Sequence, residues 1–335
     1  MEDSLSISNS KSCRMMKKQF VKWFLKMLLF VLVFIASDFL FGVTIKYLDN
    51  KAAELNPEAD KTRYVLDYVN SDVVIIGASE VEFSYRPDII MDSLGVSVYN
   101  CGKNGERLYY QTTVVNSIID RYSPKLLVWS VAPNFLIPQQ GDLDKVSIFK
   151  PFYHENGYCK QLLQSRSWYE KYKMLSYFYT YNSIFHKSII EVIKPGEKRS
   201  LYGYSPPGKK NHTVVLEDAV YEGSPEEFSI NMFEVSVKKL RNNEINTIFV
   251  FSPKYSSGDY HNLDSYIVLK NIIESNGYVI LEDYFHHPEL MHASYFKDKD
   301  HLKEDAVVIF SKMMGHELKS LLGHEIMIVN NNDLE

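Results

Sequence analysis

The sequence predicts an α/β protein whose core is a parallel sheet with helices on both faces. Short β-branched runs that end at turn residues recur along the chain, and segments with helical apolar spacing lie between them. This alternation is typical of a sheet whose strands are buried on both sides. The composition is 45% hydrophobic and 24% charged, which fits a globular chain and excludes global disorder.

Five apolar runs predict the strands, and the first of them, DVVII, ends directly before Gly77. The predicted strands cover residues 72–76, 96–99, 126–131, 247–251 and 278–281. Amphipathic spacing predicts helices over residues 108–122, 231–243 and 263–275, and a long closing helix over residues 301–322. In parallel sheets of this kind, functional side chains gather where strands end, at the carboxyl edge.

The N-terminal segment predicts a single membrane anchor. Residues 1–26 carry six Lys or Arg and two acidic residues, and residues 27–43 carry one charge, Asp38. An anchor over residues 23–45 is long enough to cross a bilayer. The basic flank predicts a cytoplasmic N-terminus, with the main domain on the periplasmic or extracytoplasmic side of the inner membrane. A cleaved signal peptide and a buried helix of a soluble protein are the alternatives.

The remaining boundaries follow from shifts in composition. The net charge of −5 argues against a nucleic-acid partner, and three scattered cysteines argue against a zinc site. The predicted parts are a basic cytoplasmic tail (1–22), the anchor (23–45), a short stalk or helix (46–70), the main domain (71–325) and a flexible tail (326–335).

Residues 135–230 interrupt the alternation of strands and helices, and they are crowded with aromatic side chains. We expect a helical insertion or lid here. Its rings form either the core of a small subdomain or a platform on which sugars stack.

Two pairs of segments carry the candidate chemistry. Ser79 follows the first strand in IIGASEVEF, where the start of a helix brings backbone N–H groups close to its hydroxyl. Asp298 and His301, in DKDHL, have the spacing with which a carboxylate orients an imidazole that activates a distant serine. Gly105, in NCGKNG, and Asn134, in SVAPNF, follow the second and third strands and could donate to the same oxyanion.

These segments, in this order, resemble the four blocks of the SGNH (GDSL-type) hydrolase superfamily. In this chain the family's Gly-Asp-Ser becomes Gly-Ala-Ser at residues 77–79, and its Gly-x-Asn-Asp becomes Ala-Pro-Asn-Phe at residues 132–135. The amino-acid sequences of the blocks also resemble those of membrane-anchored SGNH-type proteins of Bacteroidetes-like bacteria.

The resemblance implies a three-layer flavodoxin-like fold and a Ser79-His301-Asp298 triad. The oxyanion hole would use the N–H of Ser79 with Gly105 and Asn134, and no cofactor or metal would be needed. The implied function is an extracytoplasmic serine esterase that removes O-acyl groups, such as O-acetyl groups, from a glycan or another small ester. The alternatives are an O-acyltransferase for envelope polysaccharide, working with a multi-spanning acyl-transfer partner, and a non-catalytic glycan-binding or assembly protein.

The remaining histidines and cysteines do not indicate a second catalytic or metal site. His286, His287 and His292 lie in DYFHHPELMH, where Pro288 breaks the spacing of a metal site, so we expect them to line a loop. Cys101, beside the glycine turn, predicts a buried structural thiol.

Overall fold

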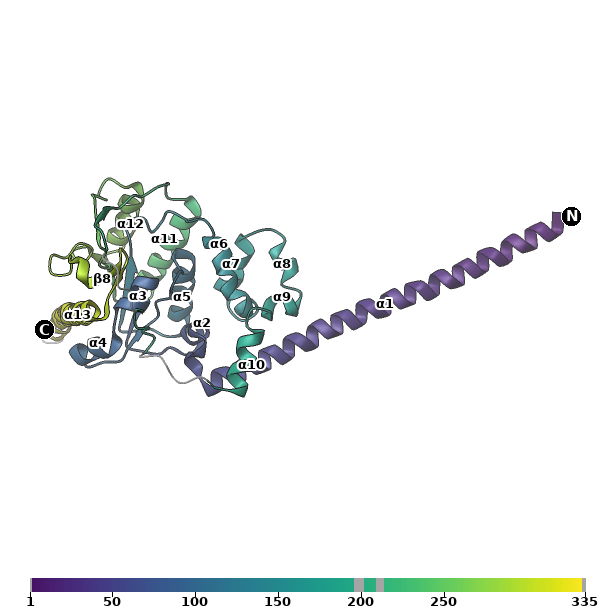
Figure 1. Ribbon diagram of the computed structural model, residues 1–335, viewed down its shortest axis with the longest axis horizontal. Coiled ribbons are helices and arrows are strands. Elements are labelled where there is room, and N and C mark those ends of the chain that lie inside the picture. The colour runs from purple at the N-terminus through teal and green to yellow at the C-terminus, as the bar shows by residue number, and fades with distance from the viewer. Residues whose placement is uncertain (1, 196–201, 209–213, 333–335) are drawn as a thin grey trace.

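The computed structural model describes residues 2–195, 202–208 and 214–332, and it is an α/β protein around a five-stranded parallel sheet. All five predicted strands are confirmed, in the spatial order β2-β1-β3-β5-β7 (Figure 1). Parallel registers join each neighbouring pair, for example Val73 with Val98 and Leu126 on its two sides. The strands are β1 (Val73–Ile76), β2 (Val98–Asn100), β3 (Leu126–Val131), β5 (Thr247–Phe251) and β7 (Val279–Leu281).

Each strand of the sheet's centre is buried on both faces, which explains its continuous apolar sequence. In β1, Val73 and Ile75 belong to one core cluster, and Val74 and Ile76 belong to the other. The cluster that contains Val74 and Ile76 is covered by three helices: α5 (Leu108–Arg121), α11 (Glu227–Asn242) and α12 (Asp264–Ser275). The opposite face is covered by α4 (Pro87–Leu94) and the closing helix α13 (Glu304–Asn332).

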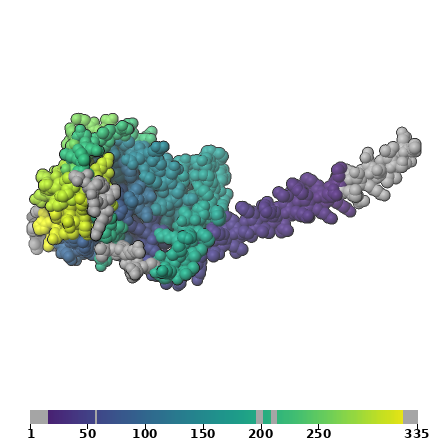
Figure 2. Space-filling view, viewed as in Figure 1, coloured from purple at the N-terminus to yellow at the C-terminus, as the bar shows by residue number. Residues whose placement is uncertain are grey.

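The N-terminal segment forms one continuous helix, α1 (Glu2–Leu55), which projects from the domain (Figures 1 and 2). Between Phe20 and Leu40 its large apolar side chains are mostly exposed. The part from Met16 to Leu55 is long and apolar enough to cross a membrane. Exposing an apolar surface of this length to water is unfavourable, and the hydrocarbon core of a bilayer would cover it.

Residues 46–70 do not form a separate stalk, because they pack against the domain. After α1 come η1 (Pro57–Ala59), α2 (Lys61–Arg63) and η2 (Tyr64–Tyr68). The side chains of Val65 and Leu66 are buried in the main core. The buried guanidinium of Arg63 pairs with Asp49 of α1, whose carboxylate also accepts a hydrogen bond from Ser188 at 3.0 Å. The polar sequence therefore makes internal contacts rather than a spacer.

The insertion is helical, as predicted, but its buried rings do not form a core of their own. Phe149 and Phe152 join the main core cluster on the face of α5. Other rings of this segment, including Trp168, are exposed. Its elements are α6 (Asp142–Lys145), η3 (Val146–Phe152), α7 (Gly157–Ser165), α8 (Glu170–Lys173), α9 (Tyr177–Tyr181), α10 (Phe185–Ile193) and β4 (Glu217–Asp218), which pairs with β6 (Ser256–Ser257).

The closing segment starts differently from the prediction. His301 lies in a strand, because β8 (Phe296–Asp298) and β9 (His301–Leu302) form a small antiparallel hairpin before α13. The helix continues past residue 322 and through residues 326–332 of the predicted tail, and residues 333–335 lie outside the described residues.

Candidate active site

Ser79 lies at the carboxyl edge of the sheet, as the first residue of the short helix α3 (Ser79–Ser84). The turn from β1 into α3 is tight, since a Cβ placed on Gly77 would approach Val81 Cγ2 to 2.1 Å. The N–H of Ala78 donates to Glu80 Oε1 at 2.9 Å, which fixes the turn from the helix side. The N–H groups at the start of a helix have no partner within the helix, so this turn presents donors around the serine.

The β8–β9 hairpin carries an imidazole to this hydroxyl from 222 residues away along the chain. His301 Nε2 lies 2.7 Å from Ser79 Oγ, and His301 Nδ1 lies 2.7 Å from Asp298 Oδ1. The N–H of Asp300 donates to the same Asp298 oxygen at 3.1 Å. Phe83 meets the imidazole edge-on, with ring centroids 5.6 Å apart. The structure thus joins Asp298, His301 and Ser79, the three side chains of the predicted triad, in one continuous series of hydrogen bonds.

The turn of the hairpin is attached to the loop that follows β5. The N–H of Tyr255 donates to the carbonyl of Lys299 at 2.8 Å, and Lys254 pairs with Asp300 at 2.9 Å. Burial alone would raise the pKa of Asp300, but the charge and hydrogen bond of Lys254 lower it overall. A charged Asp300 and its lysine partner therefore help to hold the hairpin where His301 reaches the serine.

A cavity of about 250 Å³ opens beside Ser79. Gly105 and Asn134 both line it, so the second and third predicted segments reach the same site as the serine. Gly105 has φ of 78°, in the left-handed region that favours glycine. Among the described residues, neither the Gly105 N–H nor the Asn134 side-chain amide has a hydrogen-bond partner. Both donors are free to bind a group in the cavity.

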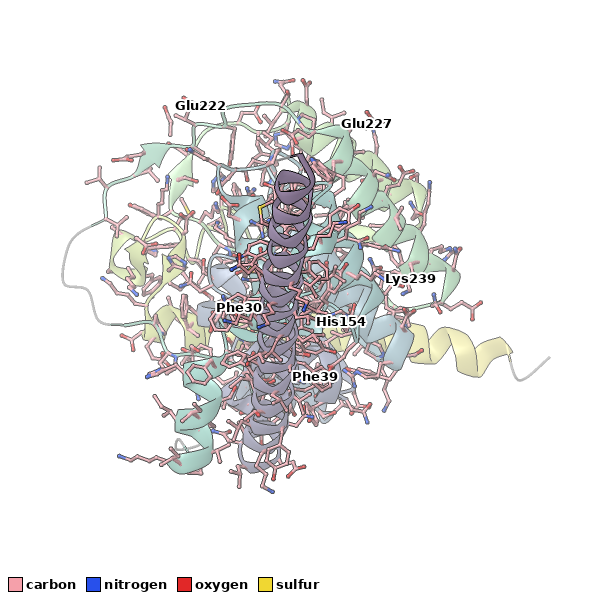
Figure 3. All side chains as sticks on the ribbon, turned by 90° about the vertical axis from the view of Figure 1, so that its right-hand side faces the viewer. Phe30, Phe39, His154, Glu222, Glu227 and Lys239 are labelled. Carbon is pink, nitrogen blue, oxygen red and sulfur yellow. The ribbon has the colours of Figure 1, made fainter. Side chains whose placement is uncertain are left out.

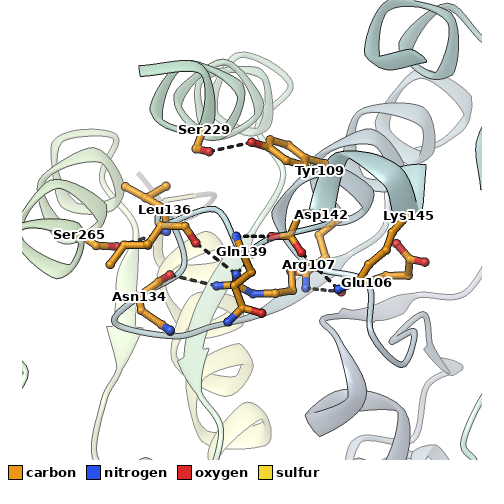
Figure 4. A network of polar contacts seen from close by, with 12 residues as sticks. Glu106, Arg107, Tyr109, Asn134, Leu136, Gln139, Asp142, Lys145, Ser229 and Ser265 are labelled. Carbon is orange, nitrogen blue, oxygen red and sulfur yellow. Dashed lines mark hydrogen bonds and ion pairs between the residues drawn. The ribbon is translucent and has the colours of Figure 1, made fainter. Parts of the chain in front are cut away.

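Arg107 fixes the loop that carries Asn134 (Figure 4). Its guanidinium donates to the carbonyl of Asn134 at 3.0 Å and to that of Ile137 at 3.1 Å. It also pairs at 3.3 Å with Asp142, whose side chain is 7% exposed. Asp142 in turn accepts from the N–H of Gln139 at 2.9 Å. One partly buried cation thus ties the cavity wall to the start of the insertion.

We expect Arg107→Met to loosen this wall and to destabilise the fold. Asp142 is buried, so removing the guanidinium leaves its charge uncompensated, which costs about 3 kcal/mol in the free energy of unfolding. Urea unfolding followed by circular dichroism measures this loss, and Arg107→Lys serves as the control that keeps the charge. Equal stability of the methionine variant and the native protein would show that the wall does not depend on this cation.

A second buried network lies beneath the serine. Ser130 in β3 donates to Glu80 Oε1 at 3.2 Å and lies 2.7 Å from the hydroxyl of Ser252, which follows β5. Ser252 is also 2.8 Å from the Tyr85 hydroxyl. These bonds join the ends of three neighbouring strands, so the turn that bears Ser79 is braced from below.

Sequence reasoning missed these supporting residues. Arg107 lies two residues after Gly105, directly before α5. An arginine at the start of a helix, where a cation is unfavourable, is the one signal that could have singled it out. Nothing in the sequence distinguishes Ser130 and Ser252 from other serines, because their role depends on strands that meet only after folding.

The competing reactive groups lie elsewhere. Cys101 is buried and unpaired, and burial raises the pKa of its thiol to about 12, so it is not a nucleophile at neutral pH. Cys159 is also buried and unpaired. His286 and His287 line a separate cavity of about 850 Å³, and His292 lines neither cavity. Within the part of the chain that the structure describes, no three His, Cys, Asp or Glu side chains are grouped as metal ligands.

Comparison of the chain with protein-family models and with curated proteins finds no match. A functional conclusion therefore depends on the geometry of the site and on the sequence motifs.

Proposed function

We propose that this chain is a serine esterase of the SGNH type, which removes short O-acyl groups from carbohydrate outside the cytoplasm. The observation that carries the proposal is the chain of two 2.7 Å hydrogen bonds from Asp298 through His301 to Ser79. A serine bonded to an imidazole that is oriented by a carboxylate is the arrangement that activates a hydroxyl for acyl transfer.

In the proposed reaction, His301 Nε2 takes the proton of Ser79 as the hydroxyl attacks the acyl carbonyl. Asp298 holds the imidazole in the required tautomer and stabilises the imidazolium that forms. The N–H groups of Ser79 and Gly105 and the amide of Asn134 stabilise the oxyanion. His301 then protonates the leaving alcohol, and water attacks the acyl-enzyme to release the acid and restore the serine.

The fold supports this assignment. Numbered along the chain, the five parallel strands have the order 2-1-3-4-5, which is the flavodoxin-like order, and core clusters on both faces fit a three-layer arrangement. In such folds the ligand lies outside the carboxyl ends of the strands, next to the first strand. Ser79 follows that strand, β1.

The cavity supports a small, polar substrate. Its lining includes amide and charged side chains, among them Asn104, Gln139 and Lys254, which can bind hydroxyl groups. Its volume of about 250 Å³ lies below the usual range for drug-sized ligands, roughly 300–1,000 Å³, so it suits an acetyl group and part of one sugar better than a long acyl chain. The membrane-spanning length of α1 supports a substrate in the cell envelope.

The proposal is tested with the full-length chain, purified in detergent, on an activated acetate ester and on acetylated and deacetylated glycans. We expect release of acetate, with faster turnover of the acetyl ester than of an octanoyl ester. Adding a free sugar as acceptor then distinguishes hydrolysis from transfer. Glycan binding without any turnover would overturn the proposal in favour of a binding protein.

We expect Asn134→Asp to lower kcat about 10²- to 10³-fold with little change in KM, because it replaces an oxyanion donor with an acceptor of the same shape. Gly105→Ala should also lower kcat, since the left-handed backbone would have to shift its N–H. Asn243→Asp, at the end of α11, is the matched control and should leave kcat unchanged. A rise in KM alone at residue 134 would assign Asn134 to substrate binding instead.

A further inference from the structure

A cluster of large apolar side chains is exposed on the insertion, around α8 and the start of α9. Five such side chains occur within eleven residues, and a water-facing surface rarely gathers so many. Their exposed fractions are 77% for Trp168, 45% for Tyr169, 55% for Tyr172, 73% for Leu175 and 55% for Phe178. We call these five residues the α8–α9 aromatic face.

This face is attached directly to the membrane-spanning helix. The carboxylate of Asp38 in α1 accepts hydrogen bonds from Ser176 Oγ at 2.7 Å and from the N–H groups of Tyr177 and Phe178 at 2.8 and 2.9 Å. The only charge in the apolar run thus binds the first turn of α9. The ring of Phe41 packs on that of Phe178, with centroids 4.9 Å apart.

The contact between α1 and α9 is too close to be a loose tether. A Cβ placed on Gly42 would approach Tyr177 Cβ to 2.2 Å, so only glycine allows this packing. Phe39 meets the Tyr177 ring edge-on at 5.5 Å. The depth of the α8–α9 aromatic face relative to the bilayer is therefore set by its position along α1.

That position lies within the apolar run, not beyond it. Asp38 precedes Ile45, the end of the predicted anchor, by seven residues, which is about 10 Å along a helix that rises 1.5 Å per residue. Surfaces that lie in the interface bury their apolar side chains about 5–10 Å into the boundary between headgroups and acyl chains. Once residues 23–45 span the bilayer, α9 cannot remain in bulk water.

The side chains have the chemistry of that boundary. Trp and Tyr are enriched where headgroups meet the hydrocarbon, because their rings are apolar and their N–H or O–H groups need a polar partner. Lys173 Nζ lies 4.4 Å from the centre of the Tyr169 ring, and Lys171 Nζ lies 5.0 Å from that of Tyr172, so cations accompany the rings. Lysines at this depth can reach phosphate groups.

We propose that the α8–α9 aromatic face inserts into the headgroup region of the same bilayer that α1 spans. The domain is thus docked on the membrane rather than held away from it. Figure 1 shows α8 and α9 on the side of the domain from which α1 projects, and Figure 3 views that side, with Phe30 and Phe39 on the helix. The proposal rests on α1 spanning a membrane and does not depend on the esterase chemistry.

The chain offers a matched control on α10, which extends along α1 away from this face. Near its start Phe185 contacts Phe41, and near its end Glu191 bonds Asn56. Ile193, at the end of α10, is 78% exposed, as much as Trp168. Its neighbour Glu191 bonds Asn56, directly after the C-terminal end of α1 and beyond the apolar run, so Ile193 should remain in water.

The test uses the full chain in lipid nanodiscs, with tryptophan fluorescence quenched by phospholipids brominated on the acyl chains near the headgroup. The protein has three tryptophans, of which Trp129 is fully buried in the sheet. Trp23→Phe removes the tryptophan of the anchor, so the difference from Trp23→Phe/Trp168→Phe gives the signal of Trp168. We expect brominated lipid to reduce this signal about twofold or more, as it does for an interfacial indole.

Two further variants make the result decisive. Trp168→Phe alone reports the anchor through Trp23, and Trp23→Phe/Trp168→Phe/Ile193→Trp places the same reporter on the control position. Quenching of Trp23 and Trp168, but not of a tryptophan at residue 193, supports docking. A quenched Trp23 with an unquenched Trp168 overturns docking. An unquenched Trp23 also overturns it, because that result would show that α1 does not span the bilayer. A Trp168 signal that changes only on adding glycan would assign the face to sugar stacking and also overturn the proposal.

Discussion

Replacing Ser79 with alanine lowers kcat/KM for an activated acetate ester by about 10⁴- to 10⁶-fold, if the proposed chemistry is correct. Three serine hydroxyls line the cavity, and among them that of Ser79 is the one bonded to an imidazole. Its loss leaves the oxyanion donors without an activated nucleophile. The hydroxyl's hydrogen-bond partner in the structure is His301 Nε2, at 2.7 Å, so its removal should leave the fold intact. Initial rates and circular dichroism on the same preparation measure both effects.

Ser275→Ala is the matched control for this variant. Ser275 ends α12, where its hydroxyl donates to the carbonyl of Ile272 at 3.2 Å, and it does not line the cavity. It should hydrolyse the ester at the native rate. If Ser79→Ala retains more than about a tenth of the native activity, another group is the nucleophile.

Replacing His301 with alanine produces a loss of similar size, about 10⁴-fold or more in kcat, because His301 is the base that bonds the Ser79 hydroxyl among the residues that the structure describes. When two residues act together in one step, the effects of replacing them on the free energy of activation do not add. The double variant Ser79→Ala/His301→Ala should therefore be no slower than either single variant. Stopped-flow measurements on the activated ester give kcat for all three proteins.

His316→Ala, on the exposed side of α13, controls for the loss of an imidazole and should retain full activity. Losses that multiply in the double variant would show that Ser79 and His301 act separately. That result would contradict a shared proton-transfer chain even if each single variant were slow.

The sheet could be predicted from the sequence because its signal is local. Strands buried on both faces need apolar residues at nearly every position, and LLVWSV of β3 and TIFVF of β5 each have only one polar residue, Ser130 and Thr247. This signal can be read without any knowledge of the neighbouring strands. The juxtaposition of Ser79 and His301 could be expected only from motif order and from the rule that carboxyl strand ends share an edge.

What the sequence could not give depends on contacts between distant residues. Residues 46–70 look like a polar spacer, but Arg63 and Asp49 pair with each other inside the protein. Asp38 looks like a defect in an apolar run, yet its carboxylate binds the first turn of α9. Periodicity placed His301 in the closing helix, whereas a two-residue turn after Asp298 keeps it in a hairpin. In the first two cases a partner far along the chain decides the local structure, and in the third a tight turn overrides the helical periodicity.

The central claim is that the Ser79 hydroxyl is activated by His301, and labelling with a fluorophosphonate tests it most directly. The intact mass should rise by one adduct, peptide mapping should place that adduct on Ser79, and His301→Ala should abolish the labelling. An unlabelled native protein, or an adduct on another residue, would contradict the account.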